Sequence, residues 1–254
     1  MWRRAAETIH ELDALIHAEI RERRACADLA GRGDVLSRLI RVDDGGDRLT
    51  DAELRDQMVT LLLAGHETTA TALAWALYEV GRSPEQRERA RTAATSGDDA
   101  WLEAVLKESM RLHPVIPMVV RTLKAPATVG GVDLPAGATV AASILVAHAR
   151  PENHPEPGAF SPGRFLGTSP PPNTWLPFGG GVRRCIGAGF SLLEGVAVLR
   201  EVFTAFDVVA VGEDEPRVRN ITSVPRHGAR VVVSRQPVVE VPAPVEVVAA
   251  TPVG

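Results

Sequence analysis

Cysteine is scarce in this sequence of 254 residues, which contains only Cys26 and Cys185. Two thiols in a chain of this length cannot form the disulfide framework that is typical of small secreted proteins. Excess positive charge is also lacking, because 28 lysines and arginines are outnumbered by 32 acidic residues, which gives a formal net charge of −4. A chain with this balance has no electrostatic attraction for nucleic acid, so no nucleic-acid partner is expected.

No segment of the sequence has the pattern of a targeting signal or a membrane span. The N-terminal segment is charged and amphipathic, and it contains no apolar stretch before a small-residue cleavage site. The longest apolar segment, residues 59–80, is interrupted by His66 and Glu67, which favours a core helix over a membrane helix. The sequence therefore predicts a cytoplasmic protein without a membrane anchor.

Hydrophobic periodicity predicts a mainly helical protein with small β-sheets. Helical patterns cover residues 5–24, 35–40, 50–81, 85–95, 99–112 and 186–206. Runs typical of β-strands occupy residues 125–147, 206–212 and 229–235, whereas residues 151–177 are proline-rich and aperiodic. Residues 236–254 are rich in proline and valine and have no period, so we expect them to form a disordered tail.

Four adjacent polar side chains interrupt the longest apolar helix, within the segment AGHETT at residues 64–69. Burying polar groups without partners is costly, and a glycine inside a helix costs about 1 kcal/mol relative to alanine. Such departures from local preference indicate a functional site, and the alternative is a polar helix face with a packing glycine. The zinc-protease motif H-E-x-x-H is excluded, because Ala70 occupies the position of its second histidine.

A polar pair, Glu108 and Arg111, lies near the end of the helix predicted over residues 99–112. Residues three apart are neighbours on a helix and can form an ion pair. An exposed pair would contribute little to stability, whereas a buried pair would need further hydrogen-bond partners. Arg164, in the proline-rich segment, is a candidate third member of such a network. An E-x-x-R pair taken alone also occurs by chance.

The segment WLPFGGGVRRCIGAGF at residues 175–190 is the most informative part of the sequence. A glycine-rich loop brings Cys185 just before a helix, where backbone N–H groups and the helix dipole favour a thiolate. The glycines remove side chains around the sulfur, which lets a flat, bulky group approach the backbone. A single thiolate does not fit a structural zinc site, and the glycine spacing does not fit a dinucleotide-binding loop. A structural buried cysteine is one alternative, and a haem iron with one axial thiolate is the other.

The sequence resembles the cytochrome P-450 family in four motifs. The segment FGGGVRRCIG at residues 178–187 matches every fixed position of the family's haem-binding signature, F-x-x-G-x-R-x-C-x-G. AGHETT is similar to its oxygen-activation motif, ESMR at residues 108–111 to its E-x-x-R motif, and PGRF at residues 162–165 to its P-x-R-F motif. The four occur in the family's order, and the resemblance extends from near the start of the chain to about Arg235.

The resemblance implies haem b as the cofactor and a role for each motif residue. Cys185 would be the axial ligand of the haem iron, with Phe178 packed beside it. Thr68 would hydrogen-bond the bound oxygen or its water, and Glu67 would help to relay protons. Arg183 and Arg121 would bind the haem propionates. Further haem contacts are expected from Gly179, Gly181, Gly187, Ala64 and Gly65, and a structural network from Glu108, Arg111 and Arg164.

The activity that the resemblance implies is that of a haem-thiolate monooxygenase, which inserts one atom of O2 into a small apolar organic substrate. Residues around Ala64, 115–119 and 221–223 would face that substrate. Because the sequence has no flavin or nucleotide fingerprint, a separate ferredoxin or flavin reductase is the expected electron donor.

The nearest analogy within the family is the soluble bacterial type. Residues 1–235 are expected to be the C-terminal portion of the cytochrome P-450 domain, so that the fold is truncated at its N-terminus. The alternative to the monooxygenase is a catalytically inactive remnant that binds haem weakly or acts only as an interaction partner.

Overall fold

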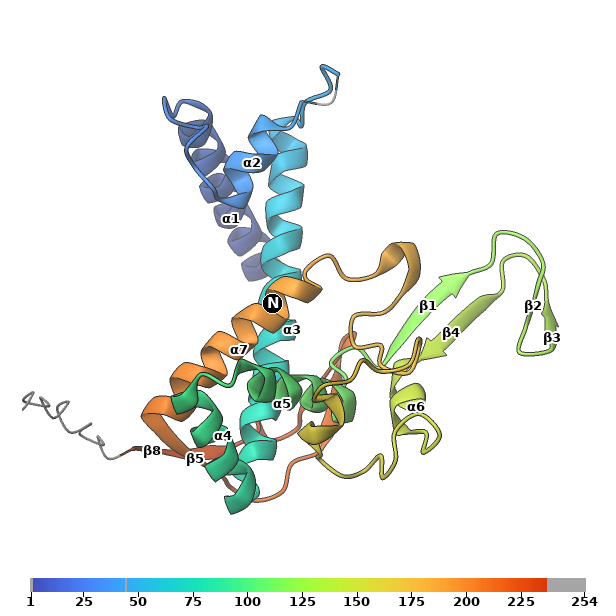
Figure 1. Cartoon of the computed structure of the whole chain (residues 1–254). Helices are drawn as coiled ribbons and strands as arrows, with labels where there is room; N and C mark the ends of the chain where they lie inside the picture. The colour runs from blue at the N-terminus through green and yellow to red at the C-terminus, as the bar shows by residue number, and fades with distance from the viewer. Residues whose placement is uncertain (1, 44, 237–254) are drawn as a thin grey trace, which may run out of the picture. The chain divides into compact units, whose positions relative to one another are not determined.

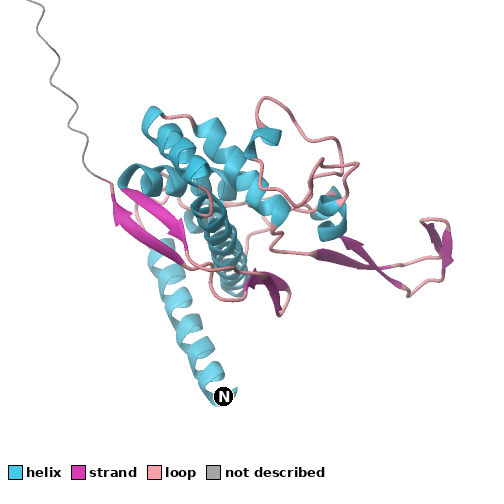
Figure 2. Cartoon of the chain, turned by 90° about the horizontal axis from the view of Figure 1, so that it is seen from below, coloured by secondary structure: helices cyan, strands magenta, loops and turns pink. Residues whose placement is uncertain are grey.

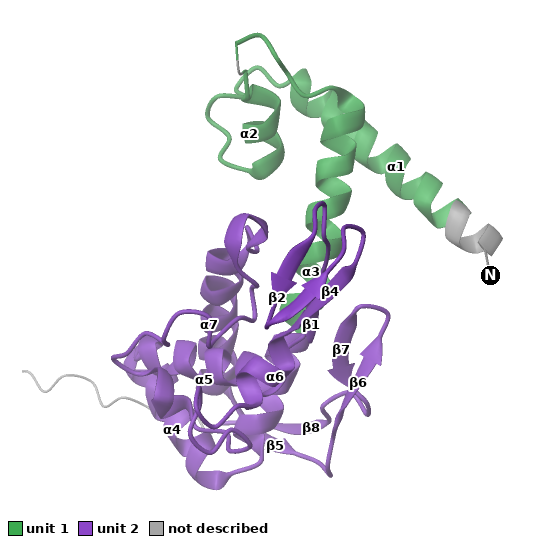
Figure 3. Cartoon of the chain, turned by 90° about the vertical axis from the view of Figure 1, so that its right-hand side faces the viewer, with its two compact units in different colours: residues 1–70 green, residues 71–254 purple. Residues whose placement is uncertain are grey.

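The computed structural model describes residues 2–43 and 45–236 (Figures 1 and 2). The chain divides into two compact units, residues 1–70 and residues 71–254 (Figure 3). The boundary between them falls within the helix α3 (Asp51–Gly81). The predicted disordered tail lies outside the described residues except for Gln236, whose amide donates a hydrogen bond to the Ala205 carbonyl at 2.9 Å.

Unit 1 consists of α1 (Trp2–Arg24), α2 (Val35–Arg41) and the first part of α3. A capping box starts α3, because the Thr50 amide donates to Glu53 Oε2 at 2.8 Å and the Glu53 amide donates to Thr50 Oγ1 at 3.2 Å. The three helices bury a small apolar core, whose members are Ile16, Ile20, Leu36 and Leu54.

Unit 2 contains the rest of α3 and the helices α4 (Pro84–Ser96), α5 (Asp99–Leu112) and α7 (Ala188–Ala205). The helix α7 packs against both α4 and α5 (Figure 1). At Gly195 the approach to α5 is so close that a Cβ atom would lie 2.3 Å from Leu106 Cδ2. The core between these helices includes Ala76, Val80, Leu102, Val105, Leu199 and Phe203.

Antiparallel two-stranded sheets complete the described part of unit 2. The strand β1 (Met118–Thr122) pairs with β4 (Thr139–Ser143), and β2 (Ala127–Val129) pairs with β3 (Val132–Leu134) between them. After α7, β5 (Phe206–Ala210) pairs with β8 (Val231–Arg235), and β6 (Pro216–Arg219) pairs with β7 (Thr222–Pro225). In both regions a short hairpin is therefore enclosed in sequence by a longer pair of strands.

The predicted class, mainly helical with small sheets, is confirmed, and α5 has the bounds that the periodicity predicts. Within the region predicted as β-like, residues 144–149 instead form the helix α6 (Ile144–Ala149), which the Ser143 hydroxyl caps by accepting from the Val146 amide at 3.2 Å. The strand β1 and the β6–β7 hairpin are absent from the sequence prediction. Residues 151–177 are irregular as predicted, apart from the 3₁₀ helix η1 (Pro162–Phe165).

Candidate functional site

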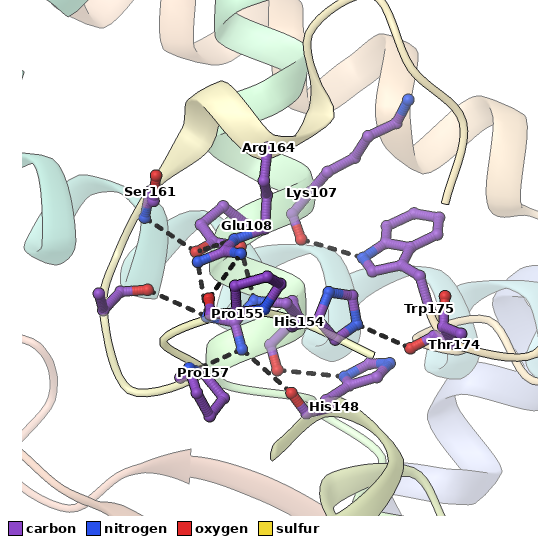
Figure 4. Close-up of polar contacts among 12 residues, drawn as sticks. Lys107, Glu108, His148, His154, Pro155, Pro157, Ser161, Arg164, Thr174 and Trp175 are labelled. Atoms are coloured by element: carbon purple, nitrogen blue, oxygen red, sulfur yellow. Dashed lines mark hydrogen bonds and ion pairs between the residues drawn. The ribbon is translucent and has the colours of Figure 1, made fainter. Parts of the chain in front are cut away.

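The carboxylate of Glu108 lies at the centre of a buried polar network in unit 2 (Figure 4). The side chain of Glu108 is 0% exposed, and that of Arg111, almost one turn further along α5, is 1% exposed. Arg111 binds the carboxylate twice, from Nε to Glu108 Oε2 at 2.7 Å and from Nη2 to Glu108 Oε1 at 3.0 Å. The sequence left the burial of this pair open, and the structure places the pair in the interior.

Arg111 uses all five of its N–H groups within the protein. Besides its two bonds to Glu108, Nη1 donates to the carbonyls of His148 at 3.2 Å and Pro157 at 2.8 Å, and Nη2 donates to the carbonyl of Ala159 at 3.1 Å. A guanidinium has five donors in a rigid planar arrangement, and a buried one is tolerated only when partners satisfy it. These bonds fix the segment that follows α6 to the C-terminal turn of α5.

Arg164, from η1, is the third member of the network. Its Nε donates to Glu108 Oε1 at 3.0 Å, and its Nη1 donates to the Pro155 carbonyl at 3.0 Å. The amide of Ser161 donates to the same oxygen of Glu108 at 2.8 Å. The structure therefore brings Glu108, Arg111 and Arg164 together, and a single carboxylate orders two arginines and the irregular chain around them.

Two histidines that the sequence prediction missed extend this network toward the glycine-rich loop. His148 Nδ1 donates to the Arg111 carbonyl at 3.1 Å, and its Nε2 accepts from the Leu176 amide at 2.7 Å. His154 Nε2 donates to the Thr174 carbonyl at 2.8 Å (Figure 4). Burial lowers the pKa of His148 from 6.5 to about 4, and burial also lowers the pKa of His154. Both rings are therefore mainly neutral at neutral pH.

The loop that carries Cys185 is held by hydrogen bonds of its own backbone. The Gly179 amide donates to the Leu176 carbonyl at 2.9 Å, and the Cys185 amide donates to the Phe178 carbonyl at 2.9 Å. Gly179 and Gly181 have φ angles of +66° and +64°, which residues with a Cβ atom disfavour. The turn itself therefore requires glycine at these two positions, a reason beyond the access to the sulfur that the sequence suggested.

The surface around the Cys185 thiol fits a flat and mostly apolar ligand. Cys185 is exposed, and the side chains of Val182 and Ile186 on either side of it are 102% and 95% exposed. Phe190, in the first turn of α7, is also exposed. A Cβ atom at Gly187 would lie 3.9 Å from Cys185 Sγ, so glycine keeps the space beside the sulfur open. A haem is flat and mostly apolar, so it could pack against such a surface, and its iron takes one axial thiolate.

The other predicted haem contacts of unit 2 come from three segments. Arg183 is exposed in the 3₁₀ helix η2 (Gly181–Arg183), and Arg121 is exposed in β1, where its Nη1 donates to the Val120 carbonyl at 2.8 Å. Exposed guanidinium groups can bind carboxylates through charge-assisted hydrogen bonds. Phe178 packs against the main core of unit 2, with its ring centre 5.8 Å from that of Trp175.

The predicted oxygen-activation residues Ala64, Gly65, Glu67 and Thr68 lie in the part of α3 that belongs to unit 1. Thr68 Oγ1 donates to the Ala64 carbonyl one turn earlier, at 2.7 Å. This bond uses the hydroxyl proton and leaves the lone pairs of the oxygen to accept from a ligand or water. The apolar pattern predicts burial here, whereas Leu63 is 70% exposed and a Cβ atom at Gly65 would meet no atom within 4 Å.

Two segments predicted to face a substrate meet within unit 2. The amide of Ser223 in β7 donates to the carbonyl of Val115 at 2.7 Å. Val115 is buried, whereas the neighbouring side chains of Met118 and Ile221 are exposed. A backbone hydrogen bond therefore joins two parts of the chain that are distant in sequence, and each part carries one exposed apolar side chain.

Among the described residues, no three side chains of histidine, cysteine, aspartate or glutamate cluster so that they could hold a metal ion. None of the helices in the described part of the chain is long and apolar enough to cross a membrane. An exposed cysteine in a glycine-rich loop and a buried glutamate–arginine network, in a helical fold with small sheets, are the features that the sequence resemblance to a haem-thiolate family predicts.

The family profile described as cytochrome P-450 matches residues 1–233. A curated relative, named Putative cytochrome P-450 135A1 from Mycobacterium tuberculosis (strain CDC 1551 / Oshkosh), is 53% identical over 232 residues, which cover 90% of this chain and 52% of the relative. The chain belongs to the cytochrome P-450 family, and it spans about half the length of the curated relatives it matches.

Two solved structures share the fold. The crystal structure of a cytochrome P-450, CYP102L1, has a TM-score of 0.81 and 25% identity, and the match covers 92% of this chain and 58% of that chain. The cyanobacterial CYP120A1 with bound retinoic acid has a TM-score of 0.80 and 28% identity, and the match covers 89% of this chain and 56% of that chain. The fold is therefore a partial cytochrome P-450 fold.

Proposed function

We propose that the chain is the thiolate-bearing part of a haem monooxygenase that oxidises a small apolar organic substrate. The observation that carries the proposal is the exposed Cys185 sulfur, in a glycine-rich loop between apolar side chains that are almost fully exposed. When bound there, haem b supplies the activation of O2 with two electrons from outside the chain. Membership of the cytochrome P-450 family supports this assignment.

The motif residues of unit 2 bind and orient the cofactor in this proposal. Cys185 would ligate the iron through its exposed sulfur, at the start of α7. Arg183 and Arg121 bind the two propionates by charge-assisted hydrogen bonds. Phe178 packs beside the sulfur. The network of Glu108, Arg111 and Arg164 holds this side of the site and takes no part in the chemistry.

In unit 1, Thr68 and Glu67 are the proposed residues that hold and move protons. The Thr68 hydroxyl donates its hydrogen bond to the Ala64 carbonyl one turn earlier. Its oxygen is therefore left to accept a hydrogen bond from a protonated ligand or from water. Glu67 is half-buried on the same helix and supplies the titratable group of the relay. Ala64 and Gly65 are the proposed haem contacts of unit 1.

The substrate and the electron donor are proposed from the chemistry of the chain. The exposed apolar side chains of Met118 and Ile221 favour an apolar substrate, and a structural neighbour with bound retinoic acid, which is mostly hydrocarbon, supports that choice. A separate ferredoxin or flavin reductase is the proposed electron donor. The cytoplasmic location stays a prediction from the sequence.

A second candidate function is haem binding without turnover. The sequence leaves this alternative open, and it requires only the exposed Cys185 loop of unit 2. The two candidates share the Cys185 site and differ in whether O2 consumption yields a product.

Spectroscopy of the reduced, carbon monoxide-bound chain tests the shared site. After expression with a haem precursor, the wild type is expected to show a thiolate-type Soret band, which Cys185→Ala abolishes. Cys26→Ala is the matched control, because it removes the other free cysteine and should keep the band. A wild-type chain that takes up no haem would overturn both candidates.

Turnover with a ferredoxin and its reductase separates the two candidates. The monooxygenase is expected to couple O2 consumption to product, and Thr68→Ala should raise the amount of O2 consumed per product. A thiolate-type spectrum without any donor-dependent O2 consumption would support the second candidate. Coupling that is unchanged in Thr68→Ala would remove this residue from the proposed proton path.

A further inference from the structure

Three hydrogen bonds that involve side chains hold the segment that leads into the cysteine loop to α5, to α6 and to the irregular chain after α6. His154 Nε2 donates to the Thr174 carbonyl at 2.8 Å, and Trp175 Nε1 donates to the Lys107 carbonyl at 3.2 Å. The Leu176 amide donates to His148 Nε2 at 2.7 Å. Three successive residues are thus anchored just before the loop begins, and Figure 4 shows the bonds of the first two, Thr174 and Trp175.

His148 differs from the other two anchors because it also binds the buried network. Its Nδ1 donates to the Arg111 carbonyl at 3.1 Å, and Arg111 Nη1 donates back to the His148 carbonyl at 3.2 Å. Two backbone hydrogen bonds continue from Leu176 into the loop: the Gly179 amide donates to the Leu176 carbonyl, and the Cys185 amide donates to the Phe178 carbonyl.

The bonds also fix which form of the imidazole occupies this position. Nε2 must accept, because its partner is the Leu176 N–H, and therefore Nδ1 carries the only ring proton. His148 is 1% exposed, and this burial is the main reason why its pKa is lowered and a second proton is disfavoured; the charge of Arg111 acts in the same direction, whereas the hydrogen bond to the Arg111 carbonyl opposes it. A protonated ring would direct an N–H at the Leu176 N–H. The neutral ring alone can make both bonds at once.

We propose that His148 is a positioning residue that holds the Cys185 loop in register with the Glu108 network. Its importance for a haem ligand rests on the proposed function, whereas its effect on the loop backbone does not. The acceptor at Nε2 holds the Leu176 amide, and the donor at Nδ1 fixes the ring so that Nε2 faces that amide. A histidine that merely filled the core would need neither of these two bonds.

Two substitutions separate the two arms of His148. His148→Asn places an amide near the position of Nδ1 and keeps the bond to Arg111, but it is too short to reach Leu176. His148→Gln extends to the position of Nε2 and can still accept from the Leu176 amide. We expect hydrogen exchange at the Leu176, Gly179 and Cys185 amides to be about tenfold or more faster in His148→Asn, and to stay near wild type in His148→Gln.

A second experiment, spectroscopy of the haem-loaded chain, tests whether Cys185 is placed correctly to bind the iron. In the haem-loaded chain, His148→Asn should lower the fraction with a thiolate-type carbon monoxide spectrum, and His148→Gln should restore it. His113→Asn is the matched control, because His113 is a partly buried histidine of unit 2 that binds Glu79 at 2.8 Å and has no bond to the loop. It is expected to leave loop exchange and the spectrum unchanged.

The exchange and spectroscopic results together decide the role of His148. Loop exchange in His148→Asn that equals wild type, or that rises no more than in His113→Asn, overturns the proposal. If His148→Asn does not fold, His148→Gln decides: wild-type loop exchange supports the proposal, and exchange about tenfold faster overturns it. A wild-type chain without a thiolate-type spectrum refutes the proposed function, while the exchange results still decide the role of His148.

Discussion

Replacing Glu108 by glutamine tests how much of the stability depends on one buried charge. Glu108 Oε1 accepts from Arg111 Nη2 at 3.0 Å, Arg164 Nε at 3.0 Å and the Ser161 amide at 2.8 Å, and Oε2 accepts from Arg111 Nε at 2.7 Å. In Glu108→Gln the net charge of the three side chains rises from +1 to +2, and an N–H group takes the place of one acceptor. Removing one partner of a buried ion pair costs about 3–5 kcal/mol, because the remaining charge is left uncompensated.

Urea unfolding, followed by tryptophan fluorescence, measures this loss. With a slope of about 2 kcal/mol per molar urea, the midpoint of Glu108→Gln is expected about 1.5–2.5 M below that of the wild type. Glu152→Gln is the matched control, because Glu152 makes an exposed ion pair with Arg150 at 3.4 Å, which solvent screens and which therefore contributes little to stability. Raising the salt concentration should reduce the small effect of the control and leave the large one unchanged. A loss below about 1 kcal/mol in Glu108→Gln would refute the reasoning.

Three further changes have expected effects on the free energy of unfolding. Gly195→Ala should lower the free energy of unfolding by about 1–3 kcal/mol, because the new Cβ atom would lie 2.3 Å from Leu106 Cδ2. The control Gly189→Ala lies in the same helix, and its Cβ atom would have no atom within 4 Å, so it should not lower this free energy. Equal losses of stability in the two variants would contradict the packing argument. Gly181→Ala should cost about 1–2 kcal/mol from its φ of +64° alone, since no atom lies within 4 Å, and an unchanged urea midpoint would disprove this. Because burial lowers the pKa of His148 from 6.5 to about 4, the unfolded chain binds this proton first as the pH falls. Stability should therefore decrease below pH 6.5 and level off below about pH 4, by about 2 kcal/mol between pH 7 and pH 5, and His148→Gln should lack this part of the slope.

The helices and the candidate site residues could be predicted because their signals are local. Thr50 and Glu53 form a capping box within four residues, and Asp34 accepts from the Ser37 amide, so both helix starts are visible in the sequence. Glu108 and Arg111 are neighbours on any helix, and their pairing follows from spacing alone. The glycine-rich loop is likewise contiguous.

The missed features depend on partners that are distant in sequence. The helix α6 is an exception, because residues 144–149 are an apolar run that could form a strand or a helix, and its cap comes from the adjacent Ser143. His148 binds only backbone atoms of Arg111 and Leu176, which the sequence cannot single out, since every residue has an amide and a carbonyl. Burial of the Glu108 network could not be predicted from the sequence either, because it depends on how the proline-rich segment folds back over α5.

The bonds that order this proline-rich segment end on backbone atoms of the segment. Arg111 and Arg164 donate to the carbonyls of Pro155, Pro157 and Ala159, and no side chain of these three residues takes part in those bonds. A substitution at such a position leaves the acceptor in place, whereas the loss or gain of one residue moves every later carbonyl out of reach of its guanidinium. The segment between α6 and η1 is consequently constrained in its length far more than in its composition, and insertions or deletions there should be more harmful than replacements.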